Sequence, residues 1–272
     1  MSHDVRTPIN GIQGCVDIAD RYPDDLKLQQ EARTKIRTAS GYLLNLVNDV
    51  LDMNKLESGN IQLERKHFNL LEVLHNTNEI IRVQANESGV NYYVEDGEII
   101  HTQLIGSPVH FQQILMNIGS NAVKYNQDGG SVTVSCREVS YMDTTAEYEL
   151  TCTDTGIGMS EEFQKKAFEP FAQEGQSART KYAGTGLGLA IAKKLIELQG
   201  GTLFFESIQG KGTKFILRIP FEISAEEQEK KSHMYQNCSV EGVQVLLVED
   251  NELNMEIAEF LLKEEKMKVT KA

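Results

Sequence analysis

The chain of 272 residues has no tryptophan, five prolines and four cysteines. The cysteines are Cys15, Cys136, Cys152 and Cys238. They form no CxxC pair and no cluster with histidine, which argues against a zinc site or a disulfide framework and predicts buried thiols in a reducing compartment. No apolar run approaches the ~18 residues that a membrane span needs, and the N-terminus has no signal-peptide pattern. We therefore expect this portion to be soluble and cytoplasmic.

Positive charge is also scarce. The chain has 27 Lys and Arg against 40 Asp and Glu, a formal net charge of −13. Such a chain repels phosphate backbones, and no basic patch offsets the repulsion, so we expect no nucleic-acid partner. The 40% apolar and 25% charged content is that of a globular protein, and the length allows roughly two domains.

Apolar residues recur at helical spacing in two early segments. They are Val5, Ile9, Ile12, Val16 and Ala19, then Ala32, Ile36, Ala39, Leu43, Leu46, Val50 and Met53. Residues 22–25 (Tyr-Pro-Asp-Asp) break the pattern, and Gly59 is a helix stop signal. Residues 1–60 are therefore predicted to form a helical hairpin. A narrow apolar stripe on one hairpin needs a second copy to cover it, which predicts a homodimeric four-helix bundle.

From residue 61 the pattern mixes helices and strands. Long helices are expected near residues 69–88 and 108–125, and strands near 132–136, 148–152, 202–206 and 213–221. The strands are not separated by regular helices, so residues 61–222 are predicted to be an α/β sandwich with helices on one face of a mixed sheet, and the class is α+β.

The C-terminal part begins with a charged, glycine-free stretch, residues 226–231, within a predicted linker at 223–242. Residues 243–272 read as a buried parallel strand followed by a helix, with Glu249 and Asp250 at the strand's carboxyl end. This is the pattern of an incomplete doubly wound α/β unit.

The segment Ser2-His3-Asp4-Val5-Arg6-Thr7-Pro8 resembles the H box of the histidine kinases, which holds their phosphorylated histidine. The resemblance implies that His3 is the phosphoacceptor and Asp4 its acidic neighbour. A neutral imidazole is a competent nucleophile, and a carboxylate can hold the other ring N–H. Pro8 should loosen the helical turn that presents His3.

The segment from Asn117 to Tyr125 resembles the N box of the same family. Asn117, Asn121 and Lys124 follow i, i+4, i+7 spacing and so share one helix face. The resemblance implies that Asn121 gives Mg²⁺ a carbonyl oxygen, that Lys124 neutralises phosphate and that Tyr125 lines the nucleotide pocket.

Asp154-Thr-Gly156-Ile-Gly158 resembles the first glycine box, whose acid accepts a hydrogen bond from the adenine amino group. A carboxylate can only accept, so Asp154 favours ATP over GTP. Gly156 and Gly158 allow close backbone approach to the base.

Phe168-Glu-Pro170-Phe171 resembles the F box, and residues 184–188 the second glycine box, with an ATP lid between them that includes Arg179 and Lys181. The glycine-rich backbone before the next helix offers N–H groups to phosphate. The remaining nucleotide contacts that the resemblance implies are Phe171, Gly184, Thr185, Gly186, Leu187, Gly188 and Thr213.

Val245 to Asn251 resembles the start of a response-regulator receiver domain, whose acid pair, here Glu249 and Asp250, holds Mg²⁺. The phosphoacceptor aspartate of that domain follows its third strand, so we expect residues 243–272 to be a fragment without relay activity. In the family the H box lies well inside its helix, so the first helix and any sensor are expected to be truncated. A parent anchored in the inner membrane would fit.

The resemblance as a whole is to a hybrid sensor histidine kinase, a protein-histidine kinase that autophosphorylates His3 from Mg-ATP and passes the phosphoryl group to a receiver-domain aspartate. Two alternatives stay open. The nucleotide fold also resembles that of gyrase and MutL-type ATPases, which hydrolyse ATP without labelling themselves. The chain could instead be a scaffold that binds ATP while His3 stays out of reach.

Overall fold

The computed structural model describes residues 2–174, 185–225, 242–248 and 252–271. The chain divides into two compact units, residues 1–224 and 225–272. The predicted linker stretch at 226–231 lies outside the described residues.

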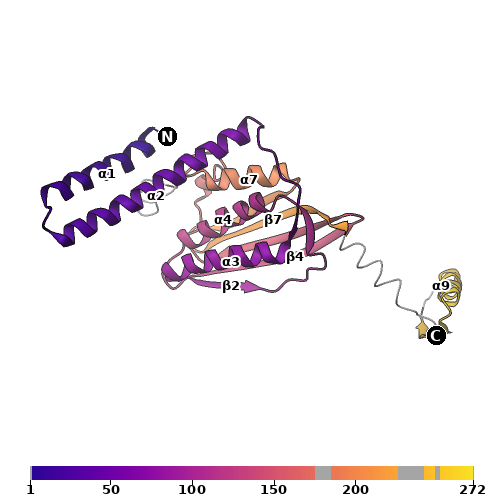
Figure 1. The fold of residues 1–272 in the computed structure, drawn as a ribbon. Helices are drawn as coiled ribbons and strands as arrows, with labels where there is room; N and C mark the ends of the chain where they lie inside the picture. Colours follow the sequence, from indigo (N-terminus) through magenta and orange to yellow (C-terminus); the bar gives the residue numbers. More distant parts are fainter. Residues whose placement is uncertain (1, 175–184, 226–241, 249–251, 272) are drawn as a thin grey trace. The chain divides into compact units, whose positions relative to one another are not determined.

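The first unit begins with a helical hairpin, as predicted. Helix α1 spans Ser2–Arg21 and α2 spans Leu26–Glu57 (Figure 1). The Asp25 side chain caps α2 by accepting hydrogen bonds from the backbone N–H groups of Lys27 and Leu28 at 3.1 and 3.0 Å. At the other end Gly59 has φ +67°, the left-handed conformation that ends many helices.

A mixed sheet of seven strands follows the hairpin. Its strands are β1 (Lys66–Asn69), β2 (Asn91–Glu95), β3 (Gln103–Gly106), β4 (Ser131–Met142), β5 (Thr145–Asp154), β6 (Thr202–Ile208) and β7 (Gly212–Ile223). Their order is β1-β3-β7-β5-β4-β2, with β6 also paired to β7. The β2–β4 pair is parallel and the others are antiparallel.

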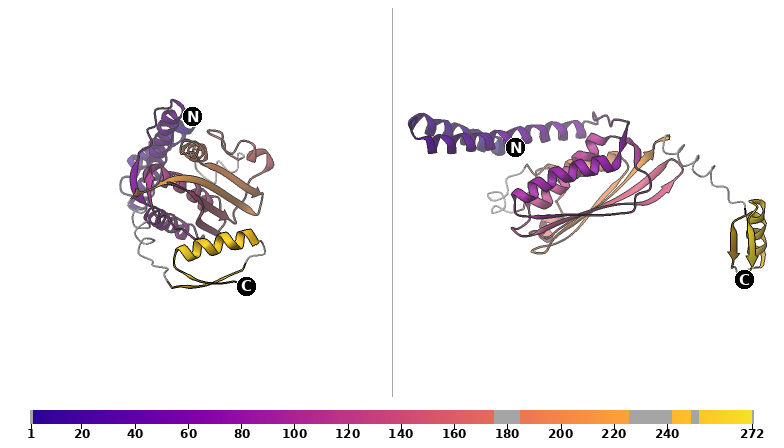
Figure 2. Two further views of the ribbon diagram at one scale, coloured as in Figure 1. Left: turned by 90° about the vertical axis from the view of Figure 1, so that its right-hand side faces the viewer. Right: turned by 60° about the horizontal axis from the view of Figure 1, so that its bottom comes forward.

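Three long helices cover one face of this sheet (Figures 1 and 2). They are α3 (Leu70–Glu87), α4 (Pro108–Lys124) and α7 (Gly188–Leu198), and the short α5 spans Glu161–Gln164. Phe111, Ile114, Tyr148, Leu195 and Leu217 are fully buried between the helices and the sheet. This arrangement confirms the predicted α/β sandwich.

Helix α2 also packs against the sandwich. Leu56 is buried in the same core cluster, with Val50 and Met53 packed against it. The Gln113 side chain of α4 donates a hydrogen bond to Asp52 Oδ2 at 2.8 Å.

The second unit contains β8 (Gln244–Leu247), α9 (Glu252–Glu264) and β9 (Lys268–Lys271), with β8 and β9 parallel. The expected strand–helix order is present, but the prediction of a buried strand is wrong. Leu246 is 64% exposed and Val248 69% exposed. Two strands and one helix cannot cover both faces of a parallel sheet.

The predicted burial of the cysteines holds for two of them. Cys136 and Cys152 are buried, and burial raises the pKa of each thiol to about 12. Cys15 is only half-buried, because it lies on the hairpin, and Cys238 lies outside the described residues.

Candidate active site

A cavity of about 530 Å³ lies where α4, α7 and the ends of β5 and β7 meet. The sequence-predicted residues that line it are Asn117, Asn121, Lys124, Tyr125, Asp154, Gly158, Thr185, Gly186, Gly188 and Thr213. Segments almost a hundred residues apart in the sequence therefore meet in one site.

Helix α4 contributes the amides and the cation. The Asn117 Nδ2 atom is buried and has no hydrogen-bond partner among the described residues, so one donor in this cavity is unused. Burial lowers the pKa of Lys124, whose ammonium lies 4.8 Å from the centre of the Tyr125 ring. Lys124 forms no ion pair within the described part of the chain. A partly desolvated cation without a counter-ion is well placed to bind an anion.

Asp154 is the last residue of β5 and is 8% exposed. Its Oδ1 accepts hydrogen bonds from the backbone N–H groups of Gly156 at 2.8 Å and Thr213 at 3.2 Å. No described residue donates to Oδ2, which is left to accept from a ligand. Burial raises the pKa of Asp154 to about 6, against the opposing effect of the two backbone donors.

The loop after Asp154 requires its glycines. A Cβ at Gly156 would lie 2.3 Å from the Tyr125 carbonyl oxygen, and one at Gly158 would lie 2.1 Å from the Ile208 carbonyl oxygen. Gly158 also has φ +62°. Any side chain would push this loop away from its neighbours and change the wall of the cavity.

The N-terminus of α7 forms another wall. Gly186 has φ +71°, and Gly188 is the first helical residue. The Thr185 hydroxyl accepts a hydrogen bond from Leu187 N at 3.2 Å and donates one to Asp49 Oδ2 on α2 at 2.6 Å. Burial raises the pKa of Asp49. The first N–H groups of a helix are unpaired within it and attract anions.

Several predicted site residues do not line the cavity. Phe171 is 39% exposed with φ +63°, so the prediction that it contacts the nucleotide has no support in this geometry. Gly156 and Leu187 are not among the lining residues, and Leu187 is fully buried. The predictions for Gly184, Arg179, Lys181, Glu249 and Asp250 lie outside the described residues. His3 and Asp4 are in α1, and their side chains are not described.

Sequence reasoning missed the contribution of α2, since Tyr42, Asn45 and Asp49 also line the cavity. Nothing in a heptad pattern identifies which helical residues face another domain. It also missed Phe215, which could have been found because it lies two residues after Thr213 and so points to the same face of β7.

The first unit thus joins a helical hairpin to an α/β sandwich whose cavity is lined by both Asp154 and Lys124. Residues 1–59 match the family model described as His Kinase A (phospho-acceptor) domain. Residues 106–223 match the model described as Histidine kinase-, DNA gyrase B-, and HSP90-like ATPase. The chain therefore belongs to the histidine kinases.

Curated relatives agree with this family. The autoinducer 2 sensor kinase/phosphatase LuxQ of Vibrio vulnificus is 33% identical over 257 residues, which is 93% of this chain and 30% of LuxQ. The sensory/regulatory protein RpfC of Xanthomonas campestris is 32% identical over 82% of this chain and 31% of its own length. The chain thus spans about a third of the length of these relatives.

Solved structures share the fold. Full-length ShkA in complex with AMPPNP has a TM-score of 0.61 at 24% identity and covers 100% of this chain and 54% of its own. Histidine kinase ThkA in complex with response regulator protein TrrA has a TM-score of 0.60 at 23% identity, over 80% of this chain and 59% of that one. Within the described residues, no helix is long and apolar enough to cross a membrane.

Proposed function

We propose that this chain binds Mg-ATP in the cavity between α4 and α7 and transfers the γ-phosphoryl group to His3, from which it passes to an aspartate of a receiver domain. The observation that carries the proposal is that one cavity holds an acceptor, Asp154 Oδ2, and two donors, Lys124 and Asn117 Nδ2, that have no hydrogen-bond or ion-pair partner among the described residues. That set matches the two ends of a purine nucleotide.

Asp154 would select the base. Its Oδ1 is held by Gly156 and Thr213, so the orientation of the carboxylate is set before the ligand arrives. The second oxygen can accept from the amino group of adenine but would repel the carbonyl oxygen of guanine. Phe215 and Met159 supply apolar surface to the same cavity.

The phosphate end would be held by Lys124 and by the N-terminus of α7. Gly186 and Gly188 leave the backbone there accessible to oxygen atoms. When bound, Mg²⁺ would neutralise charge on the phosphates. The residues fit this ion, because Asn121 offers an amide oxygen and Mg²⁺ takes few protein ligands while keeping several waters.

His3 would be the nucleophile. One ring nitrogen forms a bond to the γ-phosphorus while the bond to the bridging oxygen breaks and ADP leaves. Asp4 would hold the other ring N–H and stabilise the positive charge that develops. Catalysis of this kind depends on positioning and on charge neutralisation. ShkA, a structural neighbour of this chain, was solved with AMPPNP bound, which supports nucleotide binding by this fold.

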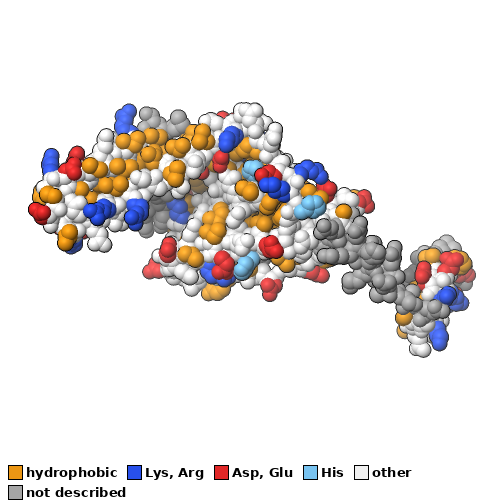
Figure 3. Space-filling model, in the orientation of Figure 1, with side chains coloured by type: hydrophobic (Ala, Val, Ile, Leu, Met, Phe, Trp, Pro, Cys, Tyr) orange, Lys and Arg blue, Asp and Glu red, His pale blue; other side chains and the backbone are white. Residues whose placement is uncertain are grey.

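The hairpin supports a homodimer. Its exposed apolar side chains include Ile9, Val16, Ile18, Leu44, Val47 and Leu51. Apolar atoms are abundant over the hairpin helices (Figure 3). Histidine kinases dimerise through such hairpins, and pairing two copies would cover this surface.

Receiver transfer is the second part of the proposal. The β8–α9–β9 order supports a receiver-like start to the second unit. ThkA was solved with response regulator TrrA, so a structural neighbour of this chain binds such a partner.

The test is incubation of the chain with γ-labelled ATP and Mg²⁺. We expect a label that is labile in acid and stable in alkali, lost in His3→Gln and kept in His75→Gln, an exposed histidine on α3. Addition of a purified receiver protein should move the label to that protein as an aspartyl phosphate, an acyl phosphate that is stable in acid and from which hydroxylamine releases the labelled phosphate. ATP hydrolysis without any protein-bound label would overturn the transfer to His3 and favour an ATPase.

A further inference from the structure

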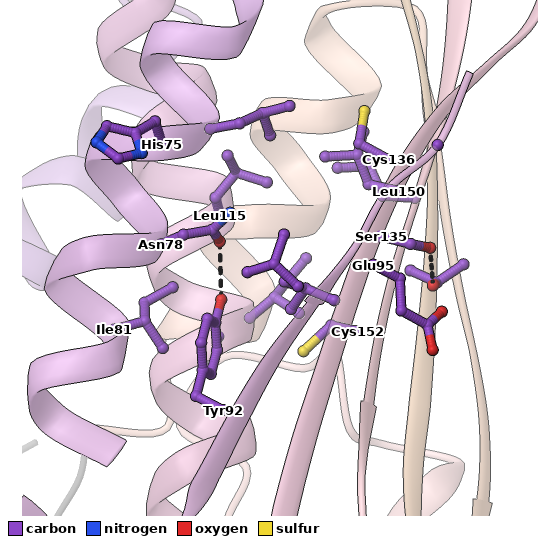
Figure 4. Close-up of a pocket in the computed structure, with 18 of the residues that line it drawn as sticks. His75, Asn78, Ile81, Tyr92, Glu95, Leu115, Ser135, Cys136, Leu150 and Cys152 are labelled. Carbon is purple, nitrogen blue, oxygen red and sulfur yellow. Dashed lines mark hydrogen bonds between the residues drawn. The ribbon is translucent and has the colours of Figure 1, made fainter. Parts of the chain in front are cut away.

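A second cavity, of about 360 Å³, lies inside the sandwich between α3, α4 and the sheet. Figure 4 shows it from within: α3 carries Asn78 and Ile81, α4 carries Leu115, and the strands carry Tyr92, Leu150 and Cys152. Nothing in the proposed phosphoryl transfer uses this space.

The lining is mostly apolar. Its apolar side chains include Leu115, Ile118, Val134, Leu150 and Phe215. The two buried thiols, Cys136 and Cys152, also line it, and burial keeps them protonated by raising the pKa of each to about 12. A much smaller apolar cavity, about 150 Å³, is enough to hold benzene, so this one has room for a ring with a short chain.

Two hydrogen-bonded polar pairs interrupt the apolar wall. The Ser135 and Thr151 hydroxyls, on β4 and β5, bond to each other at 2.8 Å. The Tyr92 hydroxyl on β2 donates a hydrogen bond to Asn78 Oδ1 on α3 at 2.8 Å (Figure 4). Burial raises the pKa of Tyr92, so the hydroxyl stays neutral. The pair still offers the lone pairs of the tyrosine oxygen and the N–H groups of the asparagine amide. A hydroxyl group can use both, because it donates and accepts.

The charged groups at the cavity are mainly acidic. Arg82 is engaged by Glu79 at 2.6 Å. Glu95 and Asp96 also line the cavity and have no ion pair with any described residue. An anionic ligand would meet uncompensated negative charge here.

We propose that this cavity is a binding site for a compact, uncharged, mostly apolar molecule with a hydroxyl at one end. The apolar body would fill the space between α3, α4 and the sheet, and the hydroxyl would bind the Tyr92–Asn78 pair. Ligand pockets commonly combine an apolar lining with a few placed polar groups in this way.

The site adjoins the nucleotide cavity. Phe215 lines both cavities, so its ring forms a shared wall. On α4, Leu115 and Ile118 line the inner cavity, and Asn117 lies between them in sequence on the nucleotide side. A molecule bound in the inner cavity would therefore contact Phe215 and α4 on the side opposite the nucleotide cavity.

Isothermal titration calorimetry of the full chain with 4-phenylbutan-1-ol tests the proposal. We expect saturable binding with one site per chain, and binding at least about tenfold weaker for 4-phenylbutanoate, which has the same apolar body and a negative charge. Val134→Phe fills the cavity and should remove the binding, whereas the same change at the exposed Val109, outside the cavity, should leave it intact.

Tyr92→Phe is a second test, which removes only the hydroxyl group and adds no volume to the cavity. It should weaken binding of the alcohol about fivefold, which corresponds to the loss of one hydrogen bond, and leave the affinity for butylbenzene unchanged. Thermal unfolding of each variant checks that it is folded. Absence of binding to the parent chain, equal binding of alcohol and carboxylate, or undiminished binding in a folded Val134→Phe variant would each overturn the proposal.

Discussion

Replacing Asp154 by Asn tests the proposed base recognition with the least structural disturbance. The two side chains have nearly the same shape, and the amide oxygen can still accept from the N–H groups of Gly156 and Thr213. Only the free oxygen changes, because it becomes an NH₂ group that donates. A donor would then face the donor of adenine, and the cavity would present a partner for the carbonyl oxygen of guanine.

The expected loss follows from the strength of one hydrogen bond to a charged group, about 1.5–3 kcal/mol. At about 1.4 kcal/mol per tenfold, Asp154→Asn should weaken ATP binding roughly 10- to 150-fold. Affinity for GTP should stay the same or rise, so the preference for ATP should collapse. The variant should fold normally, since it also removes a charge whose burial is unfavourable.

Calorimetric titration with ATP and with GTP at about pH 8 measures both affinities, at a pH where Asp154 is ionised. Asp143→Asn is the matched control, because Asp143 is exposed in the β4–β5 turn, where its φ of +50° also suits Asn. An ATP affinity within about twofold of the parent, in a variant with unchanged thermal unfolding, would refute the role of Asp154 in base recognition.

Four further predictions concern the pKa of Asp154, the N-terminus of α7 and the apolar surface of the hairpin. The pKa of Asp154, about 6 against an ordinary 3.8, means that ATP affinity should fall as pH drops below about 6, when the acceptor is protonated. Between about pH 4 and 6 the folded chain keeps the proton of Asp154 while the unfolded chain has lost it. The contribution of Asp154 to the free energy of unfolding should therefore decrease as pH rises from about 4 to 6 and stay low above that. Titration calorimetry measures the affinity effect and denaturant unfolding the stability effect, and both should vanish in Asp154→Asn. Thr185→Val removes the hydroxyl that donates to Asp49, so amide hydrogen exchange at residues 186–190 should become faster. Thr185→Ser keeps the hydroxyl and should exchange like the parent. Equal exchange in the two variants would mean that this hydrogen bond does not hold the segment. Leu44→Lys places a charge on the exposed apolar surface of α2, so light scattering should show a monomer where the parent is a dimer. Leu198→Lys, on α7, should leave the dimer intact. A monomeric parent would contradict the proposed pairing.

Local signals in the sequence identified most of the fold. The break at residues 22–25 predicted the hairpin turn, and Asp25, the acid that ends it, caps α2. Period-two alternation found the central strands, because one face of the sheet is covered by helices and the other is not. The buried character expected of the strand near residue 245 did not hold, since a run of apolar residues says nothing about how many neighbours are present to cover it.

The residues of the nucleotide cavity were also accessible from the sequence where they belong to compact motifs. Asn117, Asn121 and Lys124 share a face of α4 because 3.6 residues make a turn, and Gly158 has the positive φ that its position required. Phe171 was predicted from its motif position, but it does not line the cavity, so its contact with the nucleotide stays a prediction.

The resemblance of the motifs, in their order along the chain, to those of histidine kinases predicted the phospho-acceptor and ATPase domains that the family models match. Helix periodicity and strand alternation are local properties, so the sequence also predicted the main elements of these domains. Only the tertiary structure decided that Asp49 on the hairpin binds Thr185, that Asp154 is buried enough for its pKa to rise to about 6, and that a second cavity opens beside Tyr92. These depend on contacts between segments far apart in the chain and on the exclusion of water from between them, and neither is encoded in any single stretch of residues.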